Sequence, residues 1–245
     1  MHKTALLILI IALLSLSVLP LIPVQAMGRH KALILSSLQK LAPIRDADLT
    51  GITRPLTAAG YIITYLVDDQ VTVRLLTTRL NDYDVIIWRT NVYTREHTTY
   101  WYVGETTNQA TLQQYSSDFS SKLLDSSHGI IGASAGFFQN HFGWASLSSV
   151  KVAILVSSVS SSLAGFLLNG GVRSVVEFCS SISLQFGVVD YLTGTLMRFL
   201  SDGYDVADAV SNTVTPYLTM QPRDPLDSVQ IPTIAFTGDA TVTIT

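Results

Sequence analysis

Cysteine is almost absent from this chain of 245 residues, which contains only Cys179. A single thiol excludes an intrachain disulfide and a metal site built from several cysteines.

Charged residues are also scarce. They make up 13% of the sequence, and the formal net charge is −3. No basic cluster is present, so we expect no nucleic acid partner. The chain contains no N-x-S/T acceptor sequence, so we expect no N-glycosylation.

Histidine is present but is not arranged for metal binding. His30, His97, His128 and His141 follow neither the H-E-x-x-H nor the H-x-H spacing that brings two imidazoles to one ion. We therefore expect no metal ion and no cofactor.

The first 26 residues have the pattern of an export signal. A short polar start containing Lys3 precedes an almost wholly apolar run over 5–24, and 24–26 places small residues at the −3 and −1 positions of a cleavage site. We predict a cleaved signal and a secreted or cell-surface protein. The alternative is an uncleaved membrane tether, because the apolar run approaches the length of a bilayer span. Both interpretations place 27–245 outside the cytoplasm.

Beyond the signal, short apolar strands alternate with helical patterns, which is typical of a mainly parallel sheet covered on both faces. Residues 91–110 are polar and aromatic, and we expect them to form a loop. The pattern predicts one α/β domain over 27–245. We expect strands at 32–35, 61–67, 84–88, 152–156, 172–178 and 234–244, and helices at 44–59, 72–80, 112–124, 163–168, 188–200 and 206–214.

Three stretches of the chain resemble caspase-fold cysteine peptidases of the gingipain type, especially their exported archaeal relatives. The first is GYIITYLVDDQVTVRLLTTRLNDYDVIIWRTN (60–91), similar to the family's helix after a "VT" pair and its strand ending in Arg-x-His. The second is VKVAILVSS (150–158) with LAGFLLNGGVRSVVEF (163–178), similar to the strand–Gly–Cys, helix and next strand. The third, IAFTGDATVTIT (234–245), resembles the closing "GDPTL" strand, with Ala240 where proline is usual. The resemblance implies a caspase-like three-layer sandwich with about six mainly parallel strands.

The same resemblance implies where a cysteine peptidase would carry its catalytic pair. Carried onto this sequence, the histidine position is Asn91 and the cysteine position is Ser158. An asparagine amide does not titrate, and a serine hydroxyl without a base is a poor nucleophile. The hypothesis is therefore an inactive peptidase homologue that binds a protein or peptide.

A second serine has the sequence setting of a nucleophile. Ser134 is the centre of Gly-Ala-Ser-Ala-Gly, which matches the G-x-S-x-G elbow of hydrolases. That elbow requires a later acid and then a histidine, and the last histidine, His141, follows by only seven residues. A tight turn of small residues is the other interpretation.

An active endopeptidase is the alternative function, with Ser158 or Cys179 as the nucleophile and His97 as a displaced base. A loop histidine is more often solvated, and a lone cysteine at a strand end is more often a buried apolar side chain. A structural subunit of an extracellular assembly is a third function class. The sequence leaves the ligand and the oligomeric state undetermined.

The expected loop 91–110 carries the side chains of a recognition surface. Aromatic residues and arginine in an exposed loop suit protein or peptide binding, although the loop could instead fold back on the core. The residues are Tyr93, Arg95, Tyr100, Trp101, Tyr102 and Glu105. Asp190 begins a predicted helix, where its charge is favourable to the helix dipole.

Overall fold

The computed structural model describes residues 30–142, 146–157, 161–179, 186–219 and 233–245. Their centre is a six-stranded sheet in the order β10-β9-β8-β3-β1-β2, in which every neighbouring pair is parallel except β10 with β9. The strands are β1 (Lys31–Ser36), β2 (Ile62–Val67), β3 (Val85–Arg89), β8 (Val152–Val156), β9 (Ser174–Cys179) and β10 (Thr233–Gly238).

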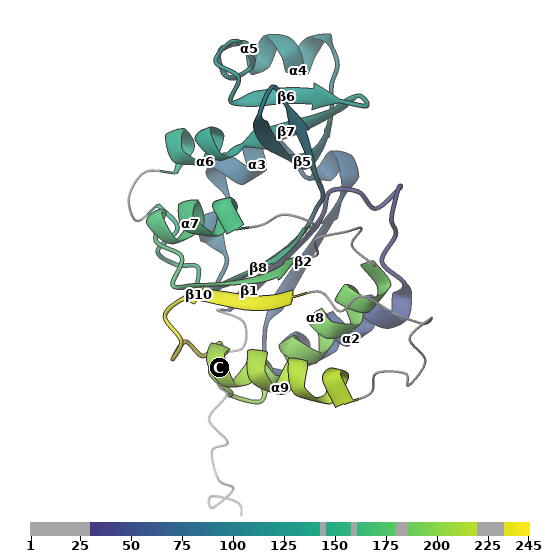
Figure 1. The fold of residues 1–245 in the computed structure, drawn as a ribbon, viewed down its shortest axis with the longest axis vertical. Coiled ribbons are helices and arrows are strands. Elements are labelled where there is room, and N and C mark those ends of the chain that lie inside the picture. Colours follow the sequence, from purple (N-terminus) through teal and green to yellow (C-terminus); the bar gives the residue numbers. More distant parts are fainter. Residues whose placement is uncertain (1–29, 143–145, 158–160, 180–185, 220–232) are drawn as a thin grey trace, which may run out of the picture.

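Helices cover both faces of this sheet, as Figure 1 shows. One face packs against α2 (Asp46–Ala58), α8 (Phe186–Ser201) and α9 (Val206–Thr219). The other face lies under α3 (Val73–Thr78), α6 (Ala135–His141) and α7 (Ser161–Asn169). Two short 3-10 helices, η1 (Asp68–Gln70) and η2 (Leu80–Asp82), flank α3. This confirms the expected α/β fold with a mainly parallel sheet of six strands between helical layers.

The alternation of side chains along each central strand explains the two cores. In β1, Ala32 and Ile34 face the α2–α8–α9 side, while Leu33 and Leu35 face the opposite side. Both sets are fully buried, so the strand is apolar on both faces and reads as a continuous hydrophobic run. The same reasoning applies to β3 and β8, whose residues are all buried.

A second sheet of four antiparallel strands, in the order β4-β5-β7-β6, extends the side that carries α3, α6 and α7 (Figure 1). It contains β4 (Val92–Arg95), β5 (Thr98–Thr106), β6 (Leu124–Ser127) and β7 (Ile130–Ser134), with α4 (Gln109–Gln114) and α5 (Ser116–Ser120) between β5 and β6. Trp101 and Val103 of β5 are fully buried in the core beneath it.

The second sheet corrects two sequence expectations. Residues 91–110 do not form a loop, because β4 and β5 make a hairpin whose two turn residues, Glu96 and His97, have positive φ. The expected helix 112–124 is instead two short helices followed by the first residue of β6. The expected strand 234–244 contains a turn at Gly238 and Asp239, and β10 does end at Gly238. Gly238 has φ 110°, and a Cβ there would lie 2.5 Å from the Arg173 carbonyl oxygen. The part after the turn is not a strand.

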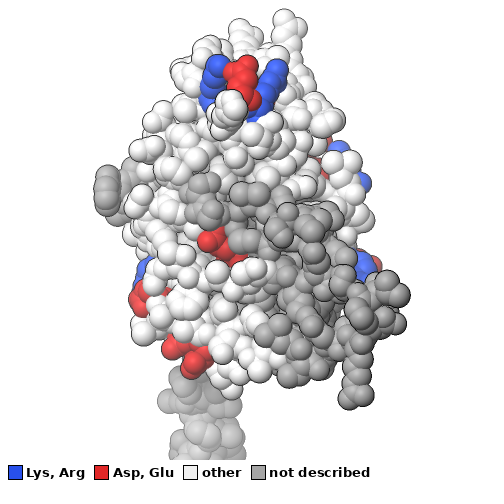
Figure 2. All heavy atoms as spheres, viewed as in Figure 1, with Lys and Arg blue, Asp and Glu red and all other residues white. Residues whose placement is uncertain are grey.

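The viewed surface is mostly uncharged, in agreement with the composition (Figure 2). Within the described parts of the chain, no helix combines the length and the apolar character that a bilayer crossing requires. The expected export signal, 1–26, lies outside the described residues.

Candidate functional site

Small polar residues follow three neighbouring parallel strands at the C-terminal edge of the large sheet. Ser37 follows β1, Thr90 follows β3 and Ser157 follows β8. The backbone ladder continues through them, since Ser37 N–H donates to the Arg89 carbonyl at 3.1 Å and Thr90 N–H donates to the Val156 carbonyl at 2.9 Å. Open α/β sheets bind ligands at this edge. These positions therefore form the candidate functional site.

Asn91 is the residue after Thr90 and is partly exposed. Its Oδ1 accepts a hydrogen bond from Val92 N–H at 2.9 Å, and its backbone carbonyl accepts one from Tyr102 N–H at 3.0 Å. The amide oxygen therefore fixes the start of β4, and the amide has no titratable proton with which to assist catalysis.

The position expected for the nucleophile, Ser158, lies outside the described residues. The preceding Ser157 is 1% exposed, and its N–H donates to the Phe178 carbonyl on β9 at 3.4 Å. Because β3 and β8 are adjacent, with Arg89 paired to Val156, Ser157 and Asn91 lie just beyond the ends of neighbouring strands.

Arg89, the last residue of β3, is a buried cation that the sequence interpretation overlooked. Its Nε and Nη2 donate to the two carboxylate oxygens of Asp190, at 2.8 and 3.2 Å, and its Nη1 donates to the Ala42 carbonyl. The guanidinium carbon also lies 4.1 Å from the centre of the Phe186 ring. Arg89 therefore links β3, the segment after β1 and the N-terminal part of α8.

Asp190 was expected to act on the helix dipole, and the structure gives it a more specific partner. The side chain is buried beside Arg89. Burial raises the pKa of the Asp190 carboxyl above its usual range, and the hydrogen bonds from Arg89 oppose that shift. One signal in the sequence could have identified this site, namely a lone arginine at the end of the apolar run 85–88.

Glu177 is a buried acid at the same edge that the sequence interpretation did not single out. It pairs in register with Leu155 of β8, so it faces the α3–α6–α7 side, opposite to Arg89. Acidic side chains are therefore present on both faces of the sheet near its C-terminal edge.

None of the described histidines lies beside Asn91. His97 sits in the tip of the β4–β5 hairpin, and β4 carries it about 13 Å away along the strand direction. His30 precedes β1 at the opposite edge of the sheet and contacts Asp84. His128 occupies the β6–β7 turn against Ser127, and His141 ends α6 beside Asp118. The structure therefore does not bring His97 to the position of a displaced base.

Ser134 has the strand–turn–helix setting of a nucleophile elbow, but its hydroxyl has a structural partner. It ends β7 and caps α6, and its Oγ accepts a hydrogen bond from Phe137 N–H at 3.3 Å. The residue is 3% exposed. His141 lies one helix length away and pairs with Asp118 at 3.1 Å.

Cys179 is the last residue of β9 and pairs in register with Thr233 of β10. Its backbone therefore reaches the same sheet edge as Ser157, one strand further along. The placement of the thiol is outside what the structure describes.

The aromatic residues expected in a recognition loop lie instead on the hairpin of the second sheet. Trp101 and Tyr100 are buried, and the Tyr93 ring lies 5.4 Å from that of Tyr100 and 4.9 Å from that of Tyr102. Burial raises the pKa of Tyr93, with a further contribution from Asp125. Of the two interpretations left open by the sequence, the structure therefore has the segment folded back on the core, and the exposed aromatic loop is wrong.

Among the described residues, no group of three or more His, Cys, Asp or Glu side chains is placed to hold a metal ion.

Of the comparisons with known proteins, the one with solved structures gives matches. No protein-family model matches the sequence, and no curated protein matches it. Among solved structures, the chain is similar to the crystal structure of the Drosophila initiator caspase Dronc, with a TM-score of 0.48 and 12% sequence identity over 88% of this chain and 81% of that chain.

Proposed function

We propose that this protein is an exported, catalytically inactive homologue of caspase-fold peptidases of the gingipain type, and that it binds a protein or peptide. The observation that carries the proposal is Asn91, the residue that the resemblance aligns with the family's histidine. Its side chain is an amide, and its Oδ1 accepts a hydrogen bond from Val92 N–H. Export rests on the sequence of residues 1–26.

The chemistry of the sheet edge supports inactivity. Cysteine peptidases of this kind need a thiolate and an imidazole that protonates the leaving amine. General acid–base assistance alone contributes about 10²- to 10⁴-fold to a rate. An amide at 91 and a hydroxyl at 158 supply neither group.

The retained frame supports a binding role. The Arg89–Asp190 pair still holds the end of β3 against α8, so the edge that would present a substrate remains fixed in place. A sheet edge that is held in place but lacks the thiolate and the imidazole can bind a peptide without cleaving it.

The experiment exposes the mature protein to a diverse pool of extended peptides and analyses both the bound and the free fractions by mass spectrometry. We expect selective enrichment of some peptides, all recovered with intact backbones. New peptide termini that appear with the wild-type protein and are absent with Ser158→Ala would overturn the proposal. A pool recovered without enrichment would remove the binding role.

A further inference from the structure

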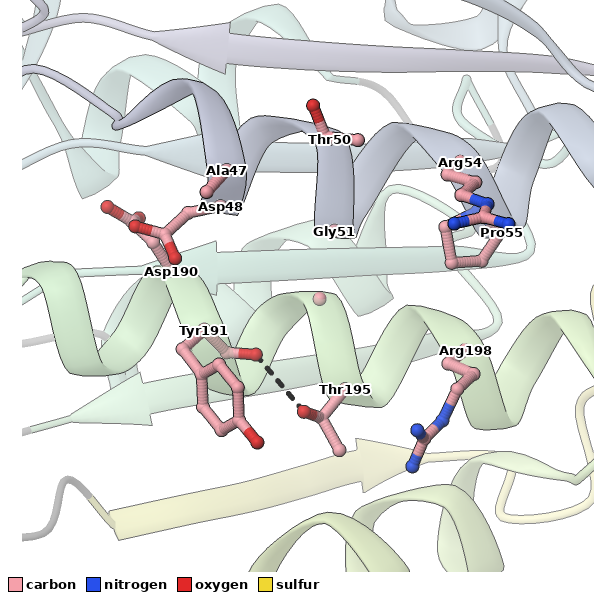
Figure 3. Close-up of a pocket in the computed structure, with 11 residues that line it drawn as sticks. Ala47, Asp48, Thr50, Gly51, Arg54, Pro55, Asp190, Tyr191, Thr195 and Arg198 are labelled. Carbon is pink, nitrogen blue, oxygen red and sulfur yellow. Dashed lines mark hydrogen bonds between the residues drawn. The ribbon is translucent and has the colours of Figure 1, made fainter.

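A groove runs along the outer side of the helix pair α2 and α8 (Figure 3). It consists of a hollow of about 490 Å³ and a neighbouring hollow of about 460 Å³. Arg54, Pro55 and Arg198 line both hollows, so the two are continuous. We refer to this surface as the α2–α8 groove.

Two glycines create the groove. α2 and α8 cross where Gly51 meets Gly194, and a Cβ added to Gly194 would lie 3.1 Å from the Gly51 carbonyl carbon. Because neither residue has a side chain, the two helices approach closely at the crossing. The space that side chains would fill at this point is part of the hollow, which both glycines line. Pro55 has no N–H, so the Gly51 carbonyl lacks its usual helical donor four residues later.

The two arginines of the groove, Arg54 and Arg198, differ from most arginines in the described part of the chain because neither is paired with a carboxylate. Among the described residues, five arginines have a carboxylate within ion-pair distance, on Asp48, Asp82, Asp190, Asp125 and Asp239. Arg54 and Arg198 are exposed and have no such pairing within the described part of the chain, apart from the contact of Arg198 with the Phe199 ring.

The acidic side chains around the groove leave these arginines in excess. Asp48 and Asp190 lie at the opposite end of the groove from the arginines, as Figure 3 shows. Each is already neutralised, Asp48 by Arg45 and Asp190 by Arg89.

Asp202 lines the second hollow and is the remaining carboxylate on the groove. Two free guanidinium groups therefore face one carboxylate, and the groove is locally positive in a chain of net charge −3.

We propose that the α2–α8 groove binds an extended acidic peptide, with glutamate or aspartate side chains held by Arg54 and Arg198. Guanidinium groups bind carboxylates through paired hydrogen bonds. Thr50 and Thr195 also line the groove, and their hydroxyl oxygens can accept hydrogen bonds from peptide N–H groups. One end of the groove shares Asp190 with the sheet edge, but the two arginines lie at the other end. The proposal does not depend on the activity or inactivity of the sheet edge.

The dimensions of the groove favour a peptide over a small anion. It follows α2 from Ala47 to Ala59, which corresponds to about 18 Å of helix and accommodates about five extended residues. Its volume is in the range of sites for ligands much larger than phosphate. The exposed Tyr191 ring and Pro55 add apolar contacts along the path that a lone phosphate would not use.

The test measures fluorescence anisotropy of a labelled, amidated pentapeptide with alternating alanine and glutamate, titrated with the full chain. We expect saturable binding that weakens at high salt, and no binding of the glutamine counterpart. Arg54→Gln combined with Arg198→Gln should weaken binding at least about tenfold. Thr50→Glu, which keeps both arginines, should weaken it by repulsion at the same exposed groove.

The matched control is Arg74→Gln. Arg74 is also exposed and also lacks a carboxylate partner among the described residues, but it lies on α3 at the other face of the sheet. Its loss should leave affinity within about twofold. Equal weakening by Arg74→Gln, unchanged binding in both groove variants, or equal displacement by inorganic phosphate and by unlabelled peptide would overturn the proposal.

Discussion

The Arg89 guanidinium and the Asp190 carboxylate form a two-point ion pair that is buried from solvent, with nitrogen–oxygen distances of 2.8 and 3.2 Å. The two residues are far apart in the sequence and join the end of β3 to the start of α8. Breaking one side of a buried pair leaves an uncompensated charge, which is the costly case.

Asp190→Asn should therefore destabilise the protein by about 3–5 kcal/mol, measured by urea unfolding. The double variant Arg89→Met with Asp190→Leu should cost less than the sum of its single changes, because it removes both charges together. Arg95→Gln, which breaks an exposed pair with Asp125, is the control and should cost less than about 1 kcal/mol. Equal effects of Asp190→Asn and Arg95→Gln would contradict the structural role of the buried pair.

The sequence could predict the large sheet because β1, β3 and β8 each contain an unbroken run of four or five apolar residues. The run 152–156, for example, became β8 at the expected residues. The β4–β5 hairpin escaped prediction because its turn, Glu96-His97, adopts positive φ without glycine or asparagine. At the site, the polar residues after β3 and β8 could be expected from the sequence. The partner of Arg89 could not, since no local pattern links residues on different elements.

The helix crossing at Gly51 and Gly194 gives a second prediction. Gly194→Val places a branched side chain where even a Cβ would lie 3.3 Å from the Gly51 carbonyl oxygen, and α2 would have to move. The expected destabilisation is about 2–3 kcal/mol in thermal and urea unfolding. Gly165→Ala is the control, since nothing lies within 4 Å of its added Cβ, and it should stabilise α7 by about 0.5–1 kcal/mol. Tolerance of valine at 194 would contradict the described packing.

Ser134 provides a third prediction, which separates a helix cap from a nucleophile. Ser134→Ala removes the acceptor of Phe137 N–H and should cost about 1 kcal/mol of folding free energy. Ser120→Ala, at an exposed position on α5, should stay within about 0.5 kcal/mol of the wild type. Covalent labelling of Ser134 by a serine-directed phosphonate in the folded protein would show a reactive hydroxyl and contradict the cap.

The turn after β10 gives a prediction in pH. Hydrogen bonds from Arg173 and Thr241 lower the pKa of Asp239 to about 2. A carboxyl whose pKa is lower in the folded state than the usual value of about 3.9 stabilises the fold above that usual value. The contribution is lost as the pH falls toward 2.

Asp239→Asn should therefore lower the urea midpoint at pH 6 and lower it less at pH 2, with the difference shrinking between about pH 4 and pH 2. The effect should be small because the group is exposed. A difference between variant and wild type that grows on acidification would show that the sign is wrong.

The most direct measurement of the central claim is the initial rate of fluorogenic peptide hydrolysis by residues 27–245 between about pH 5 and pH 9, for the wild type and Ser158→Ala. Because the proposal assigns the family's imidazole position to Asn91, which cannot titrate, it predicts that both proteins stay at the background rate at every pH, under reducing and non-reducing conditions. Saturable hydrolysis by the wild type that disappears in Ser158→Ala would contradict it.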